Sequence, residues 1–176
     1  MAIAQLESPL HHPLPPVFLG NEAVGRLPLA FVARTIDIRD VMTNVAADVA
    51  AEAAKRGQLL NVKYGAAPLW VNGDRQRLHQ VFSNLLRNAI KSTDYGGRIT
   101  FTADRHMSRI AVRVRDTGRG IDRQALPRIF DLFAKELSVV REIVSLHRGR
   151  IDAHSDGLGK GSEFEVTLPA SSAGGS

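Results

Sequence analysis

The segment between Asp74 and Lys91 constrains the fold of this chain more than any other, because it carries two stripes of residues at helical spacing. One stripe is apolar and belongs in a core: Leu78, Phe82, Leu85 and Ala89. The adjacent stripe, at positions i, i+4 and i+7, carries two amides and an ammonium: Asn84, Asn88 and Lys91. Amide oxygens can coordinate a hard divalent cation, and a lysine can bind a phosphate group. The pattern therefore predicts a core helix with a polar edge suited to a charged ligand.

A second motif, Asp116-Thr-Gly118-Arg-Gly120-Ile121, follows a predicted strand at 110–115. It places a carboxylate at the end of that strand, followed by two glycines that let the backbone approach a flat ligand closely. A dinucleotide-binding Rossmann motif is a poor match, because the third glycine and a long following helix are both missing.

Composition excludes several classes of protein. The 176 residues suit one domain with a real core, and no apolar run approaches the length of a membrane span. The chain has no cysteine, so it has neither disulfides nor thiolate metal sites, and we expect it to be cytoplasmic. The net charge of +5 comes from scattered arginines rather than a basic block, which argues against nucleic-acid binding.

The chain divides into a proline-rich lead-in at 1–34, a folded domain at 35–169 and a tail of disordered composition at 170–176. A short apolar element is possible at 27–32. Within the domain the patterns predict strands at 35–38, 59–64, 69–71, 99–103, 110–115, 151–155 and 163–168, and helices at 40–56 and 137–147. A further helix carries the two stripes described above, and Asp74 is its expected N-cap. This order indicates an α+β fold: a two-layer sandwich whose mixed sheet is covered on one face by three main helices.

Two further segments accompany the two motifs in order: Leu126-Pro-Arg-Ile-Phe130-Asp-Leu-Phe133 and Gly159-Lys-Gly161-Ser-Glu-Phe. Together the four resemble the N box, first glycine box, phenylalanine box and closing strand of the histidine-kinase branch of the Bergerat-fold ATPases (the GHKL superfamily). Gyrase, mismatch-repair and heat-shock chaperone ATPases belong to the same superfamily. The resemblance covers most of the chain and implies the Bergerat ATP-binding fold.

The resemblance also implies roles for particular residues. Asn88 would coordinate Mg²⁺, Asn84 and Lys91 would contact phosphate oxygens, and Asp116 would accept a hydrogen bond from the adenine amine. The same adenine pocket would involve Gly118, Gly120 and Ile121, whereas Phe130 and Phe133 are either core residues or part of a lid hinge. The hydrolases of the superfamily have a glutamate general base where this chain has Asn84, so we assign no catalytic residue and expect phosphoryl transfer rather than hydrolysis.

Two features depart from the family pattern. The family has a flexible lid and a second glycine box after the phenylalanine box, but here Phe133 leads through Ala134-Lys-Glu directly into a predicted helix. The glycines at 157, 159 and 161 lie between the last two strands and do not replace that box. None of the six histidines has the sequence context of a phosphoacceptor or metal-ligand spacing.

These observations favour the ATP-binding catalytic domain of a two-component sensor histidine kinase, a monomer that binds Mg-ATP and transfers phosphate to a histidine on another segment or chain. ATP and ADP, a histidine-bearing dimerisation hairpin and a response regulator are its expected partners. An alternative is a non-catalytic nucleotide- or partner-binding module of the same fold that recognises a response regulator. A more distant alternative is a serine kinase of the anti-sigma-factor type.

Overall fold

The computed structural model describes residues 30–132 and 134–172 of the chain. Most of the proline-rich lead-in (1–29), Phe133 and the end of the predicted tail (173–176) lie outside the described residues. Contacts divide the chain into Met1–Ala30 and Phe31–Ser176, and all the helices and strands described below belong to the second unit. Residues 30–33, which include part of the apolar element predicted at 27–32, have no regular secondary structure.

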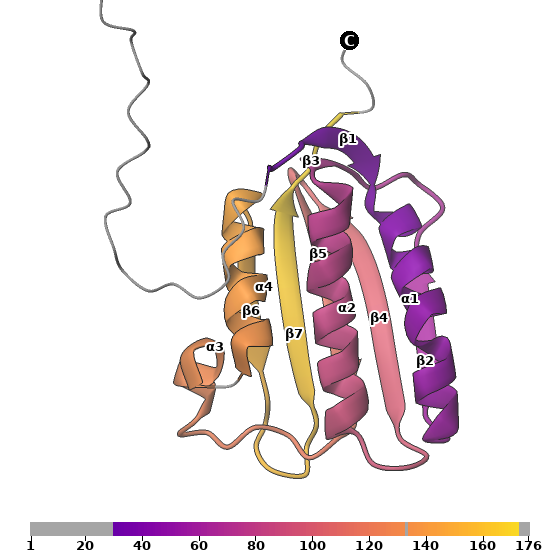
Figure 1. The fold of residues 1–176 in the computed structure, drawn as a ribbon, viewed down its shortest axis with the longest axis vertical. Coiled ribbons are helices and arrows are strands. Elements are labelled where there is room, and N and C mark those ends of the chain that lie inside the picture. Colours follow the sequence, from indigo (N-terminus) through magenta and orange to yellow (C-terminus); the bar gives the residue numbers. More distant parts are fainter. Residues whose placement is uncertain (1–29, 133, 173–176) are drawn as a thin grey trace, which may run out of the picture. The chain divides into compact units, whose positions relative to one another are not determined.

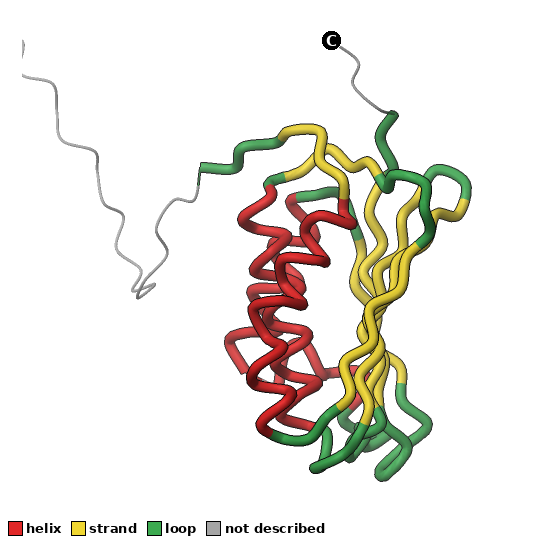
Figure 2. The backbone as a smooth tube through the Cα atoms, turned by 90° about the vertical axis from the view of Figure 1, so that its right-hand side faces the viewer, coloured by secondary structure: helices red, strands yellow, loops and turns green. Residues whose placement is uncertain are grey.

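The Phe31–Ser176 unit has two layers, a sheet and a set of helices on one of its faces (Figures 1 and 2). Five strands form the main sheet in the order β2-β4-β5-β7-β6, and only the β2–β4 pair is parallel. Their bounds are β2 (Leu59–Tyr64), β4 (Arg98–His106), β5 (Arg109–Asp116), β6 (Arg150–His154) and β7 (Ser162–Pro169). A separate antiparallel pair joins β1 (Arg34–Asp37) to β3 (Trp70–Gly73). The predicted mixed sheet is confirmed.

The helical layer consists of α1 (Ile38–Lys55), α2 (Arg75–Ser92) and α4 (Ala134–Leu146), with a short 3₁₀ turn (Leu126–Arg128) and α3 (Ile129–Leu132) before α4. The apolar stripe predicted for α2 is buried, and the strands contribute alternate residues to the same core. The largest fully buried side chains include Phe82, Leu85, Ile99, Phe101 and Leu168. The opposite face of the sheet is polar, and there Arg113 pairs with both Asp104 and Glu165.

Aspartates begin the two long helices. Asp37 and Asp74 have extended backbones and accept hydrogen bonds from the first turns of α1 and α2, as the sequence predicted for Asp74. Because Asp37 caps its helix, α1 begins two residues earlier than the predicted start at 40. Each carboxylate also accepts a backbone hydrogen bond from a segment distant in sequence, so each capping residue holds its helix against that segment. The backbone N–H donors are those of Arg39, Leu69, Arg77 and Val32.

Buried polar side chains hold both ends of α2 in place. At its start, His147 Nε2 accepts a hydrogen bond from the backbone N–H of Asp74 at 2.9 Å. At its end, Gln58 Nε2 donates to the carbonyl oxygens of Ile90 at 3.0 Å and Thr93 at 2.7 Å. Side-chain donors of this kind satisfy carbonyls that the helix itself leaves without partners. The polar edge of α2 is therefore held in a defined position relative to the sheet.

Acidification is expected to destabilise this domain through Asp37 and Asp74. Burial alone would raise the pKa of each carboxyl, but the hydrogen bonds that the carboxylates accept outweigh burial and hold each pKa below its usual value. Their stabilisation is therefore fully present above the unfolded-state pKa of about 3.9 and is lost as pH falls through the lower folded-state value. Urea unfolding between pH 7 and pH 3 measures the loss. The double variant Asp37→Asn, Asp74→Asn should show a flatter pH profile, and an unchanged profile would contradict the assignment.

Candidate functional site

A cavity of about 350 Å³ lies between the C-terminal half of α2, the loop after β5, the start of α4 and the loop that joins β6 to β7. Its size is within the range of small-molecule sites. Its wall combines apolar side chains with a few polar groups, as such sites do. The lining residues are Asn88, Ser92, Arg119, Gly120, Ile121, Asp122, Ala125, Ile129, Leu137, Leu158, Ser162 and Phe164.

Backbone hydrogen bonds join the two loops that border this cavity. Arg119 N donates to the carbonyl of Ser92 at 3.0 Å, which ties the loop after β5 to the last turn of α2. Gly159 N donates to the carbonyl of Arg119 at 2.7 Å, and Gly161 N donates to that of Gly118 at 3.1 Å. The β6–β7 loop therefore supports the loop after β5 along its length. Residues far apart in sequence form one continuous wall.

The glycines of the Asp116 motif are required by the closeness of these segments. A Cβ atom on Gly118 would lie 2.1 Å from the carbonyl oxygen of Ser92. Gly120 has φ +70°, and a Cβ there would lie 2.1 Å from the carbonyl oxygen of Gly157. Neither position can accept a side chain without moving the backbone. The structure therefore accounts for both glycines through contacts within the protein, and their approach to a flat ligand stays a prediction.

Asp116 is only 3% exposed and lies directly behind the cavity wall. Its Oδ1 accepts a hydrogen bond from Gly118 N at 2.8 Å, and its Oδ2 accepts one from Ser162 Oγ at 2.6 Å. Ser162 lines the cavity, so the carboxylate and the hydroxyl form a polar pair at its base. Each carboxylate oxygen has a second lone pair that can accept a further hydrogen bond. The arrangement suits recognition of an N–H donor on a bound ring.

Asn88 is half-buried on the cavity wall, one helical turn before Ser92. Its side-chain amide makes no hydrogen bond with any residue in the described part of the chain. An amide oxygen of this kind suits Mg²⁺, which accepts oxygen ligands and completes its shell with water and phosphate oxygens. The residues present therefore fit a magnesium ion held through Asn88 and a bound polyphosphate. Among the described residues, no cluster of three or more His, Asp or Glu side chains could hold a metal alone.

Five of the predicted site residues are not among the described residues that line the cavity: Asn84, Lys91, Asp116, Gly118 and Phe130. Asn84 lies one turn before Asn88, where its amide meets the first turn of α4 and donates to the carbonyl of Glu136 at 3.5 Å. Lys91 is exposed to solvent on α2. Phe130 packs edge-on against Phe164 with ring centroids 6.1 Å apart, so it supports the cavity from behind. Phe133 lies outside the described residues.

Sequence reasoning missed several residues on the wall. Ser92 follows Asn88 by one helical turn, and Ser162 follows the Gly159–Gly161 segment, so both had a positional signal. Arg119 lies between the two glycines of the Asp116 motif. The sequence shows its positive charge but does not indicate that this residue lines the cavity. Leu158 is 68% exposed and reaches the cavity from the β6–β7 loop. No local pattern distinguishes such a leucine from any other exposed loop residue.

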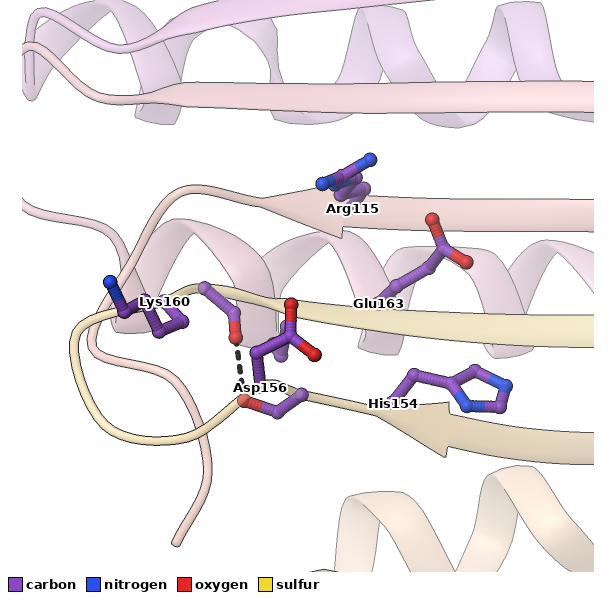
Figure 3. Close-up of a pocket in the computed structure, with 8 residues that line it drawn as sticks. Arg115, His154, Asp156, Lys160 and Glu163 are labelled. Carbon is purple, nitrogen blue, oxygen red and sulfur yellow. Dashed lines mark hydrogen bonds between the residues drawn. The ribbon is translucent and has the colours of Figure 1, made fainter.

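A second hollow, of about 200 Å³, lies on the other side of the β6–β7 loop, at the sheet face without helices (Figure 3). Charged side chains of both signs surround it, including Arg115 and Lys160, Asp156 and Glu163. Arg115 and Glu163 are register partners on β5 and β7, and Glu163 faces His154 across the next pair. All its lining residues are polar or glycine, so it offers less apolar surface for a flat ring than the first cavity does. The first cavity is therefore the better candidate site.

Comparison with known proteins decides the family. Residues 73–172 match the family of histidine kinase-, DNA gyrase B- and HSP90-like ATPases. The chain belongs to this family. The match includes the α2 motif, the Asp116 motif and the closing strand, and it confirms the resemblance predicted from those motifs. Nucleotide binding is the property that membership in this ATPase family implies.

Individual relatives point to the histidine-kinase branch. The sensor histidine kinase TrcS of Mycobacterium tuberculosis is 34% identical over 152 residues, which cover 76% of this chain and 29% of TrcS. The catalytic domain of the histidine kinase ThkA has a TM-score of 0.72 and 25% identity, covering 78% of this chain and 95% of that domain. Full-length ShkA, solved in complex with AMPPNP, has a TM-score of 0.75 and 25% identity, covering 85% of this chain and 33% of ShkA. The chain thus corresponds to less than a third of TrcS but to nearly all of the ThkA catalytic domain.

Among the described residues, no helix is both long enough and apolar enough to span a membrane. The cytoplasmic location and the monomeric state expected from the sequence stay predictions.

Proposed function

We propose that this chain binds Mg-ATP in the 350 Å³ cavity and presents its γ-phosphoryl group to a histidine on a dimerisation hairpin, carried by another segment or chain. The observation that carries the proposal is that two residues line the same cavity: Asn88, whose amide makes no hydrogen bond within the described residues, and Ser162, whose hydroxyl bonds the buried Asp116 carboxylate behind the wall. The first group suits a magnesium-bound polyphosphate and the second suits the amine of adenine. ShkA, whose fold this chain shares, was solved with the nucleotide analogue AMPPNP.

In this proposal the protein contributes position and charge. The adenine ring enters among the apolar side chains, and its exocyclic amine donates to the Asp116 carboxylate. The phosphates extend along α2 past Asn88 toward Asn84, whereas Lys91 is exposed outside the described cavity wall. Bound magnesium would neutralise phosphate charge. An imidazole nitrogen of the acceptor histidine attacks the γ-phosphorus, the bond to the ADP oxygen breaks, and the imidazole loses its N–H proton.

The short connection before α4 affects how the γ-phosphate is held. Apart from Phe133, which is not described, residues from Ile129 to Leu146 are helical, and no glycine-rich lid separates α3 from α4. Backbone N–H groups of such a lid would otherwise bind the phosphates. Glu136, in the first turn of α4, places a negative charge near their expected path. We therefore propose similar affinities for ADP and ATP.

Calorimetric titration of the chain with ADP and ATP, with and without Mg²⁺, tests nucleotide binding. We expect binding that tightens with Mg²⁺, and Asn88→Ala should remove that dependence while keeping the magnesium-free affinity. Asn44→Ala, at an exposed position of α1, is the matched control and should behave as the wild type. Failure of the wild-type chain to bind either nucleotide would refute the proposal.

Phosphoryl transfer needs a second experiment, because binding alone does not require it. The chain is incubated with ATP labelled at the γ-phosphate and with the dimerisation hairpin of a related sensor kinase. Acid-labile, base-stable label on the hairpin indicates phosphohistidine and supports the proposal. Nucleotide binding without any labelled hairpin would favour the alternative, a binding module without catalysis.

A further inference from the structure

Arg119 is the only cationic side chain among the described residues that line the cavity. It lies at the variable position of the Asp116 motif, between Gly118 and Gly120. No hydrogen bond or ion pair joins its guanidinium to another described residue, although the side chain could make five. An exposed arginine without a partner is unremarkable on most of a protein surface, but this one borders the candidate nucleotide site.

The backbone of Arg119 is fixed more firmly than its exposure suggests. Its N–H is bonded to the carbonyl of Ser92 and its own carbonyl accepts from Gly159 N, so both α2 and the β6–β7 loop hold it. The glycines on either side have no room for a side chain. The base of the arginine is thus positioned beside the cavity, whereas its long side chain remains free to meet a ligand.

A bound polyphosphate would need a counter-charge that the rest of this wall does not supply. Lys91, the cation predicted for that role, is not among the described lining residues, and a glycine-rich lid is missing. Asp122, the anionic residue on the wall, repels phosphate, and its Oδ1 already accepts a hydrogen bond from Gln124 N at 2.7 Å. A guanidinium can bind two phosphate oxygens at once through parallel N–H donors.

We infer that Arg119 binds a phosphate group of the nucleoside polyphosphate and supplies charge and hydrogen bonds that a lid would otherwise provide. The inference rests on the proposed nucleotide site and identifies a residue that determines how the ligand's phosphates are recognised. The alternative role for Arg119 is stacking of its guanidinium on the adenine ring. Stacking would strengthen the binding of adenosine as much as the binding of AMP, ADP or ATP, whereas a phosphate contact would strengthen only the latter three.

The test compares adenosine, AMP, ADP and ATP by calorimetry on the 176-residue chain. Arg119→Ala should weaken ADP and ATP binding by about tenfold to hundredfold, the range expected when a charge-assisted hydrogen bond is lost, and change adenosine binding by less than about twofold. Arg119→Lys should give an intermediate loss, because it keeps the charge without the paired donors. Arg123→Ala, at an exposed arginine of the same segment outside the cavity wall, is the matched control and should bind ADP normally.

The dependence of ADP affinity on salt concentration is a second test on the same proteins. ADP affinity should fall with ionic strength in the wild type and fall less steeply in Arg119→Ala. Equal weakening of adenosine and ADP, or unchanged ADP binding in Arg119→Ala, would overturn the inference while leaving the proposed nucleotide site intact. A wild-type chain that binds no nucleotide would instead refute the proposed function itself.

Discussion

Replacing Asp116 by asparagine is expected to weaken ADP binding by about tenfold to hundredfold while the domain stays folded. Asparagine has the same shape, and its Oδ1 can still accept the hydrogen bond from Gly118 N. Its amide nitrogen would replace Oδ2 and face Ser162 Oγ, which can turn to accept instead of donate. What the variant loses is a charged acceptor for the adenine amine, a loss of about 1.5–3 kcal/mol.

Measuring GDP binding as well as ADP binding distinguishes loss of base recognition in Asp116→Asn from a general loss of structure. Guanine carries an oxygen where adenine carries its amine, so an amide N–H at position 116 suits GDP better than a carboxylate does. The ratio of ADP to GDP affinity should therefore fall in Asp116→Asn. Urea unfolding of both proteins provides the control for stability. Equal losses for ADP and GDP, or no loss for ADP, would show that the carboxylate does not recognise the base.

Replacing Gly161 by alanine is expected to destabilise the domain by more than about 3 kcal/mol. Gly161 has φ +71°, and a Cβ there would lie 2.1 Å from the carbonyl oxygen of Asp116 and 3.2 Å from the Cα of Thr117. Both neighbours are backbone atoms, so the ends of β5 and β7 would have to separate. The adjacent Ser162 would move with them, and ADP binding should be lost together with stability.

Gly159 is the matched control in the same loop. Its φ of +76° is nearly that of Gly161, but a Cβ there would meet no atom within 4 Å. Gly159→Ala therefore carries only the conformational cost, about 1–2 kcal/mol, and keeps the hydrogen bond from its N–H to Arg119. Urea denaturation of the two variants measures the difference. Equal destabilisation would mean that backbone conformation alone, and not the contact with Asp116, makes Gly161 necessary.

The candidate site was only partly predictable from the pattern of α2. Helical periodicity placed Asn84, Asn88 and Lys91 on one side of the helix. The cavity, however, touches α2 over about one turn, at Asn88 and Ser92. Asn84 lies where α4 begins, and Lys91 is exposed. Periodicity specifies the direction of a side chain around a helix axis, but the elements packed against that helix decide which turn borders a cavity.

The fold was more predictable than the site. The strand predicted at 59–64 matches β2, and the helix that Asp74 was expected to cap is α2. Helix α4 begins at Ala134, three residues before its predicted start, because the chain enters it almost directly from α3. Caps, alternation and helical spacing depend on neighbours in sequence, which explains why elements could be located without coordinates.

The sequence by itself determined the order of the strands and the three main helices, the N-cap of α2 and the family. Only the tertiary structure decided that the β6–β7 loop supports the Asp116 motif, that Ser162 pairs with the buried carboxylate, and that Arg119 carries the positive charge of the cavity wall. The physical reason is distance along the chain. Local sequence patterns indicate the secondary structure of a residue and the side of the helix or strand on which it lies. The wall of a binding site, by contrast, is formed by loops that contact one another only after the sheet has assembled.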